Sequence, residues 1–284
     1  MEKIGILVDS ASDISNELAQ RLNIYTLSLY VNLDGEFLKD RIDISSDEFY
    51  KWVSENNSLP KTSAPSPGDV INLYKKIKAD GYEKVLAISI GSKFSSTYSL
   101  LNTSKIEGLE TYVFDSGNLT MAEGMFAIYA DNLIKKGLSF EEIIAKLNEK
   151  KDKSFVFFTI DSFKYIVEGG RVPKTFGKIG DALSVKPIIS VNPLESAFKL
   201  VKIARGEKKV LNELRKFAEN EIENVKDYYM FLGHGGYQEG ISKLEEKLSD
   251  IIAGAKECFK VQISPTLGAN TGPGLYGFGI FKID

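Results

Sequence analysis

The sequence predicts an α/β protein with two domains. An N-terminal parallel sheet flanked by helices is expected over residues 1–157, and a C-terminal α+β domain with a mixed, partly antiparallel sheet over residues 158–284. Three observations carry this prediction. The chain has 284 residues, about twice the usual length of one domain. Its first half alternates short apolar runs with amphipathic stretches, and its second half pairs apolar runs across turns. No proline- or glycine-rich linker marks the boundary, which is placed between residues 154 and 161.

In the first half, five short apolar runs predict strands, at residues 4–8, 25–31, 85–90, 112–114 and 155–160. The stretches between them have apolar residues at helical spacing, over residues 13–22, 70–78, 121–136 and 140–150. This alternation is typical of a parallel sheet with helices on both faces. Residues 31–38 differ, because Asp34-Gly35 between alternating residues predicts a small hairpin inserted into one crossover.

After residue 161 the order of elements changes. A helix at 163–168 is expected to end at Gly169-Gly170, and strands at 187–191 and 197–204 are joined by a turn at Asn192-Pro193. A helix at 209–223, a strand at 228–232 and a helix at 238–252 follow. Strands near residues 259–263 and 275–283 complete the domain. Strand pairs joined by a turn, with helices between them, predict the mixed sheet.

Composition excludes several classes of function. The 36 basic and 39 acidic residues give a net charge of −3 without long blocks of one sign, so no nucleic-acid partner is expected. No run approaches the ~18 apolar residues of a membrane span, and the N-terminus does not resemble a signal peptide. The single cysteine, Cys258, lies in an apolar stretch that predicts a buried strand residue and not a reactive thiol. These features together predict a cytoplasmic protein.

The loops that follow the predicted strands are rich in hydroxyl groups. They cover residues 9–13, 61–69, 91–97 and 115–117. Ligands of open parallel sheets bind at the carboxyl ends of the strands, where these loops would converge. Some of the hydroxyls have a simpler explanation, because Ser66 before Pro67 and Asp69 fits a helix N-cap, and Ser95 or Ser96 could cap another helix. Capping does not explain Thr62, Ser63 or the rest of the Ser95-Ser96-Thr97 cluster. These hydroxyls predict a site for a carboxylate or phosphate.

Two enzyme hypotheses use the same loops. A nucleophilic serine needs a base, but the only histidine is His234 in the second half, and no Gly-x-Ser-x-Gly motif is present. A Mg²⁺-dependent phosphoryl-transfer or hydrolytic enzyme using Asp9, Asp13 and Asp115 is the alternative hypothesis, although the chain has no phosphate-binding loop. Residues 272–277 match Gly-x-Gly-x-x-Gly, but a glycine-kinked strand is expected there and not a dinucleotide site.

An exposed basic loop is expected directly after Gly169-Gly170, from Arg171 to Lys174. The simplest interpretation is a solvated surface turn. A third hypothesis makes this loop the functional part of the protein, as a protein-interaction surface with no small ligand.

Six ordered motifs resemble those of the bacterial DegV family, whose members are similar to the fatty-acid-binding subunit of bacterial fatty acid kinase. The resemblance runs nearly from end to end. The motifs are Asp9-Ser10-Ala11-Ser12-Asp13, Thr62-Ser63-Ala64-Pro65-Ser66-Pro67, Ser92-Lys93-Phe94-Ser95-Ser96-Thr97-Tyr98, Glu168-Gly169-Gly170-Arg171, Lys186-Pro187-Ile188 and Asn270-Thr271-Gly272-Pro273-Gly274.

The resemblance implies a non-catalytic protein that holds one long-chain, palmitate-like fatty acid in a tunnel between its domains. The carboxylate would be held by Thr62 and Ser95, and the residues implied around it are Ser63, Asn270 and Thr271. Arg171 would dock an ATP-dependent fatty acid kinase that forms the acyl phosphate. No cofactor and no metal are expected. The implied role is lipid transport or fatty acid metabolism, which is compatible with transient contact with a membrane surface.

Two positions depart from the family's pattern. Ser96 stands where glycine is usual, and Asn270 stands where histidine is common. An amide can donate a hydrogen bond to a carboxylate, but it cannot supply the positive charge of an imidazolium. We therefore expect the second departure to affect phosphorylation more than binding.

Overall fold

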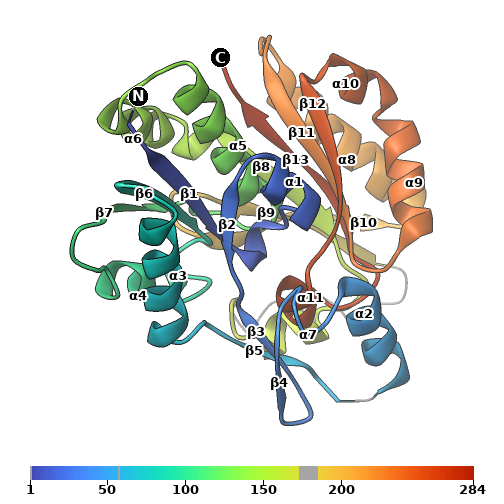
Figure 1. Cartoon of the computed structure of the whole chain (residues 1–284). Helices are drawn as coiled ribbons and strands as arrows, with labels where there is room; N and C mark the ends of the chain where they lie inside the picture. The colour runs from blue at the N-terminus through green and yellow to red at the C-terminus, as the bar shows by residue number, and fades with distance from the viewer. Residues whose placement is uncertain (1, 57, 173–184) are drawn as a thin grey trace.

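Two β-sheets with one long helix between them form the framework of the molecule (Figure 1). The structure is a computed structural model that describes residues 2–56, 58–172 and 185–284. The central helix, α5 (Met121–Lys135), contacts β1 and β6 of one sheet and β8 and β13 of the other. Twelve of its 15 residues are buried, as expected for a helix covered on opposite sides.

The first sheet has four parallel strands in the order β2 (Ile24–Leu27), β1 (Ile4–Asp9), β6 (Lys84–Ser89) and β7 (Glu110–Asp115). Every residue of β1 is buried, because helices cover both faces of the sheet. Leu7 packs in the cluster that contains α3 (Pro67–Ala79) and α4 (Thr97–Thr103), whereas Ile6 and Val8 pack in the cluster that contains α5 and α6 (Phe140–Glu149). The short α1 (Asn16–Arg21) lies against β2. The predicted parallel sheet flanked by helices is confirmed.

A second, three-stranded antiparallel sheet lies beside this domain, in the order β4 (Glu36–Lys39), β3 (Tyr30–Leu33) and β5 (Lys61–Ser63). The predicted hairpin is confirmed, and its turn has φ of 50° at Asp34 and 99° at Gly35. The single strand expected at 25–31 is instead divided between β2 and β3, which belong to different sheets. Helix α2 (Ser46–Glu55), begun by a Ser45–Glu48 capping box, had not been expected.

The six-stranded mixed sheet has the order β10 (Ala197–Arg205), β9 (Val185–Asn192), β8 (Ser154–Thr159), β13 (Tyr276–Lys282), β11 (Tyr228–His234) and β12 (Glu257–Gln262). Only β11 and β12 are parallel among its pairs. Helices α8 (Glu207–Ile222) and α9 (Gln238–Lys247) contact this sheet, and α10 (Ser249–Gly254) follows. The predicted mixed, partly antiparallel sheet is confirmed.

Strand β8 corrects one sequence-based expectation. The run at 155–160 was grouped with the strands of the parallel sheet, but β8 pairs antiparallel with β13 and β9. No local pattern could reveal this, because β13 lies at the far end of the chain. The division at residues 157 and 158 remains a prediction. The helix expected at 238–252 is also divided, into α9 and α10.

Two short helices complete the region near the small sheet: α7 (Lys164–Glu168) and α11 (Pro265–Thr271). Helix α11 contacts α2, α7, β3 and β5 (Figure 1). It was not expected from the sequence, although Ser264 before Pro265 is a pattern typical of a helix start. Gly272 ends α11, and a strand follows the glycine run and not the helix that a dinucleotide-binding motif needs. The expected kinked strand over 272–277 is wrong for its first four residues, which form a turn, because β13 begins only at Tyr276.

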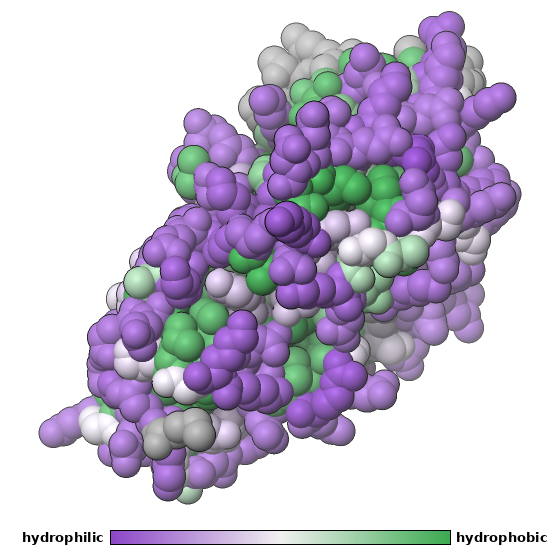
Figure 2. Space-filling view, turned by 90° about the horizontal axis from the view of Figure 1, so that it is seen from above, coloured by the Kyte–Doolittle hydropathy of each residue, from purple (hydrophilic) through white to green (hydrophobic). Residues whose placement is uncertain are grey.

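The face seen in Figure 2 is largely hydrophilic, with hydrophobic residues in patches between charged ones. Within the described ranges, no helix is long and apolar enough to cross a membrane.

Cys258 lies in β12 as expected for a strand residue, but it is half-buried and not fully buried, because β12 is an edge strand. Burial raises the pKa of its thiol to about 11, which keeps the thiol protonated and unreactive at neutral pH.

Candidate functional site

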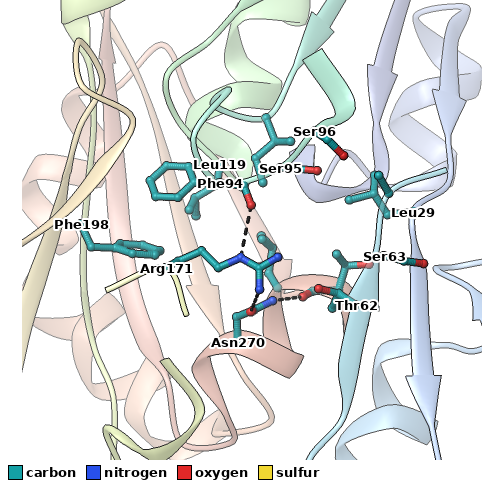
Figure 3. A pocket seen from close by; sticks show the side chains of 14 residues that line it. Leu29, Thr62, Ser63, Phe94, Ser95, Ser96, Leu119, Arg171, Phe198 and Asn270 are labelled. Atoms are coloured by element: carbon teal, nitrogen blue, oxygen red, sulfur yellow. Dashed lines mark hydrogen bonds between the residues drawn. The ribbon is translucent and has the colours of Figure 1, made fainter. Parts of the chain in front are cut away.

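A pocket of about 260 Å³ lies where the small sheet, the loop after β6, the segment after α7 and helix α11 meet (Figure 3). We call it the head pocket. Its polar lining consists of Thr62, Ser63, Ser95, Ser96, Arg171, Thr266 and Asn270. Its apolar lining consists of Leu29, Ala64, Ile90, Phe94, Leu119, Phe198 and Leu267. The segments come from both halves of the chain, so the pocket exists only in the folded molecule.

Thr62 and Ser63 reach the pocket from β5, which is held by pairing of Thr62 with Val31 and of Ser63 with Tyr30 in β3. Among the described residues, the hydroxyls of Thr62, Ser63 and Ser96 have no hydrogen-bond partner. The sequence-predicted segments therefore do meet at one pocket. Thr62 and Ser63 are successive strand residues and point to opposite faces, and the Ser63 hydroxyl is directed away from Arg171 (Figure 3).

Ser95 has both a structural and an open role. Its Oγ accepts a hydrogen bond from the Thr97 backbone N–H at 3.3 Å and lies 2.8 Å from Thr97 Oγ1. When the Thr97 hydroxyl donates to Ser95, the Ser95 hydroxyl keeps its own proton for the pocket. Ser66, by contrast, is a cap only: its Oγ accepts from the Asp69 N–H at 3.1 Å in a capping box at the start of α3.

Arg171 is the charged side chain among the residues that line the head pocket. Its guanidinium donates to the Phe94 carbonyl at 3.3 Å, to the Gly169 carbonyl and to Asn270 Oδ1 at 3.3 Å. Asn270 in turn donates from Nδ2 to the Thr266 carbonyl at 3.0 Å. Desolvation lowers the pKa of Arg171, but an arginine remains charged at neutral pH. Among the residues that the structure describes, the pocket therefore combines open hydroxyls with one positive charge, which favours an anion.

A second pocket, narrow and almost wholly apolar, adjoins the head pocket. It has a volume of about 40 Å³ and shares Leu119, Phe198, Leu267 and Asn270 with the head pocket. Further lining residues are Thr120, Val156, Phe158, Phe231, Gly233, Ile263, Thr271, Leu275, Gly277 and Phe278. We call it the apolar pocket. The Phe198 ring stands where the two pockets meet, with its centroid 4.7 Å from that of Phe94 and 6.0 Å from that of Phe158.

Thr271 was expected at the head group with Asn270, but the structure places it in the apolar pocket. Its hydroxyl donates to the Leu267 carbonyl at 3.0 Å inside α11, so it is already used. The side chains of Asn270 and Thr271 point to different pockets because successive residues of a helix lie on different faces.

The three carboxylates of the alternative enzyme hypothesis do not line either pocket. Asp9 accepts hydrogen bonds from the Ile90 and Ala11 N–H groups at 2.8 and 3.0 Å. Asp13 pairs with Arg41 at 3.0 Å, and Asp115 accepts from the hydroxyl of Ser92 at 2.8 Å. Each carboxylate is thus occupied by a structural contact.

Within the described ranges, no group of three or more His, Cys, Asp or Glu residues is arranged to hold a metal ion. Burial also raises the pKa of Asp9 to about 7 and raises that of Asp13, which further weakens both as metal ligands. His234 lines neither pocket, so the pocket serines have no imidazole base beside them.

Sequence analysis missed Leu29, Phe198 and Thr266. Only Thr266 left a usable signal, since the Ser264-Pro265 start would have placed it in the first turn of a helix. Arg171 is exposed, as expected, and its side chain is also directed to the head pocket (Figure 3). Pro173 and Lys174 of the predicted basic loop lie outside the described residues.

Comparison with known proteins identifies the family. The model of the DegV family matches residues 3–282. A DegV domain-containing protein of Clostridium acetobutylicum is 33% identical over 287 residues, covering 99% of this chain and 100% of the relative. The chain belongs to the DegV family.

Solved structures of DegV family proteins have the same fold. A DegV family protein of Thermus thermophilus, described as fatty-acid-binding, has a TM-score of 0.91 at 27% identity, over 99% of this chain and 100% of that chain. A stearic-acid-binding protein of Eubacterium ventriosum has a TM-score of 0.87 at 26% identity, over 99% and 98% of the two chains. The α/β architecture with its six-stranded mixed sheet is therefore the DegV fold.

Proposed function

We propose that this DegV family protein binds one long-chain, palmitate-like fatty acid and presents its carboxylate to an ATP-dependent fatty acid kinase. The observation that carries the proposal is the junction of the head pocket, with its open hydroxyls and one cation, with an apolar pocket. The fatty-acid-binding DegV family protein of Thermus thermophilus and the stearic-acid-binding protein of Eubacterium ventriosum support it. The role would be in lipid transport or fatty acid metabolism.

In this proposal the carboxylate lies between Thr62 on β5 and Ser95 on the loop after β6. Ser63 and Asn270 complete the polar wall. Each neutral hydroxyl bond to a carboxylate contributes about 1.5–3 kcal/mol, and the charge of Arg171 at the same pocket offsets part of the cost of desolvating the anion. These groups fix the orientation of the ligand.

The tail supplies most of the affinity. A palmitate-like tail has about 14 methylenes, and burying each contributes ~0.8 kcal/mol, for a gross gain on the order of 11 kcal/mol. Association costs of several kcal/mol are subtracted from this sum. The apolar pocket, with a volume of about 40 Å³, is too small for such a tail, so some of its lining side chains must move for a tail to enter.

Protein purified without added lipid is expected to carry about one fatty acid per chain, because tail burial is worth several kcal/mol net. Native mass spectrometry, followed by solvent extraction and identification of the lipid, measures this directly. The lipid-free protein should also take up a fluorescent fatty acid. If the purified protein carries no stoichiometric lipid and the lipid-free protein takes up no probe, the proposal is wrong.

The chain itself is proposed to be non-catalytic. Neither the pocket serines nor the buried aspartates have the partners that nucleophilic or metal-assisted chemistry requires, so phosphoryl transfer is assigned to the kinase partner. We propose that Arg171, at the pocket that holds the carboxylate, also contributes to docking of that partner.

Arg171→Ala is expected to leave the fatty acid bound, because the tail dominates affinity, and to lower acyl-phosphate production about tenfold or more when a bacterial fatty acid kinase and ATP are supplied. Bound lipid is measured by mass spectrometry and acyl phosphate by hydroxylamine trapping. Lys93→Ala is the control, because Lys93 is an exposed cation in the neighbouring loop outside the pocket lining. Unchanged phosphorylation would show that Arg171 does not dock the kinase. Loss of the bound lipid would show that Arg171 binds the head group and has no separate docking role.

A further inference from the structure

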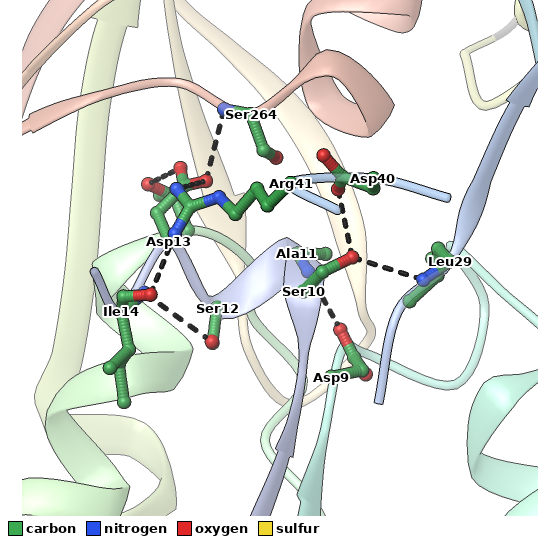
Figure 4. A network of polar contacts seen from close by, with 11 residues as sticks. Asp9, Ser10, Ala11, Ser12, Asp13, Ile14, Leu29, Asp40, Arg41 and Ser264 are labelled. Carbon is green, nitrogen blue, oxygen red and sulfur yellow. Dashed lines mark hydrogen bonds and ion pairs between the residues drawn. The ribbon is translucent and has the colours of Figure 1, made fainter. Parts of the chain in front are cut away.

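A buried carboxylate, that of Asp13, joins three segments that are far apart in the sequence (Figure 4). Its Oδ1 accepts from Arg41 at 3.0 Å and from the backbone N–H of Ser264 at 3.0 Å. Its Oδ2 accepts from the hydroxyl of Thr120 at 2.6 Å. Arg41 also donates to the carbonyl of Ile14 at 2.6 Å, so one guanidinium spans two groups of the same turn.

The backbone at this junction is strained. Asp13, Arg41 and Thr120 have φ of 55°, 64° and 52°. Aspartate tolerates the left-handed region, but an arginine or a β-branched threonine adopts it at a cost. Arg41 and Thr120 both donate to the Asp13 carboxylate. Backbone strain of this kind persists where the surrounding contacts fix a functional geometry.

The residue before Arg41 makes a second contact with the same region. Asp40 Oδ2 accepts from the hydroxyl of Ser10 at 2.8 Å, and Ser10 Oγ accepts from the Leu29 N–H at 3.1 Å. The Asp40 N–H donates to the Leu29 carbonyl at 2.9 Å. Leu29 lines the head pocket, so this chain of contacts reaches one wall of the site.

The Asp13 contact reaches the opposite wall. Ser264 immediately precedes α11, and its side chain makes no capping bond. Its N–H is instead held by Asp13, so the start of α11 is located by that carboxylate. Helix α11 carries Thr266, Leu267 and Asn270 of the head pocket. A helix of only seven residues cannot keep its position without such tertiary contacts.

We propose that Arg41, acting through Asp13, is a positioning residue for the head pocket: it fixes the start of α11 against the small sheet that carries Thr62. The inference rests on the proposed function. Arg41 lines neither pocket. Its contribution is to hold Asn270 and Thr266 at the spacing from β5 that a carboxylate requires, since small displacements of positioning groups have large effects.

The test compares the dissociation constants of palmitate and of hexadecanol at about pH 8 for the wild type, Arg41→Gln and Arg41→Lys. We expect Arg41→Gln to weaken palmitate about tenfold more than hexadecanol, because only the acid depends on the head-pocket spacing. Arg41→Lys keeps the charge but cannot reach both Asp13 Oδ1 and the Ile14 carbonyl. Its palmitate affinity, relative to hexadecanol, should therefore lie between those of the wild type and Arg41→Gln. Arg21→Gln, which removes an exposed ion pair with Glu257 of β12, is the control.

The one tryptophan supplies a readout without ligand. Trp52 in α2 packs in the same cluster as Ala269 of α11, so displacement of α11 should shift its emission in lipid-free Arg41→Gln and not in Arg21→Gln. Equal weakening of acid and alcohol with unchanged Trp52 emission would overturn the inference and leave Arg41 with a general stabilising role. If the wild type binds no palmitate, the proposed function fails instead, and Trp52 emission still decides whether Arg41 positions α11.

Discussion

The double variant Thr62→Ala/Ser95→Ala is expected to bind palmitate at least about a hundredfold more weakly than the wild type. Each hydroxyl bond to a carboxylate contributes about 1.5–3 kcal/mol, and without them part of the anion is left buried and unpaired. Hexadecanol should lose much less affinity, because it has the same tail and no charge to leave unpaired. Isothermal titration of lipid-free protein with both ligands measures the difference.

Ser66→Ala is the matched control for this variant. Ser66 lies in the same loop as Thr62, but its hydroxyl accepts from the Asp69 N–H at the start of α3 and does not line the head pocket. Its loss should lower stability by about 1 kcal/mol and leave palmitate affinity unchanged. If acid and alcohol lose affinity equally in the double variant, Thr62 and Ser95 are structural hydroxyls and the carboxylate binds elsewhere.

The free energy of unfolding of the lipid-free protein is expected to fall as pH rises from about 4 to about 7. Complete burial raises the pKa of Asp9 from 3.8 to about 7. Between these values the folded state holds a proton that the unfolded state releases, so the stabilisation is full at low pH and is lost as pH rises through 7. A shift of this size corresponds to a change on the order of 4 kcal/mol.

Asp9→Asn should flatten this dependence, whatever its effect at low pH, because an amide cannot ionise. Urea unfolding at about pH 5 and about pH 8 gives the slope for each variant. Burial also raises the pKa values of Asp13, Glu123 and Asp40, that of Asp40 to about 6, so these three carboxyls leave a residual slope of the same sign. Asp34→Asn in the exposed β3–β4 turn removes the same charge as a control. A slope in Asp9→Asn equal to that of the wild type would show that Asp9 is ionised in the folded protein.

Much of the secondary structure follows from local patterns. The buried strands β1 and β6 are continuous apolar runs, and helices such as α3 have both an amphipathic pattern and a capping box. Patterns of this kind depend on neighbours within a few residues, so they can be recognised without the fold. Where the sequence-based prediction differs from the structure, as for β8, the difference lies in which sheet a strand joins. That choice depends on pairing with β13, more than a hundred residues away along the chain.

The sequence alone determined that hydroxyl-rich loops follow the strands and that Ser66 is a cap. The family resemblance implied that Thr62, Ser63, Ser95 and Asn270 belong to one site, and all four line the head pocket. The tertiary structure decided the rest. It placed Arg171 at the head pocket, Thr271 in the apolar pocket and Phe198 between the two. It also buried Asp13 against Arg41. The physical reason is that a short motif specifies its own backbone, whereas the direction in which a side chain is buried depends on elements that pack against it from distant parts of the chain.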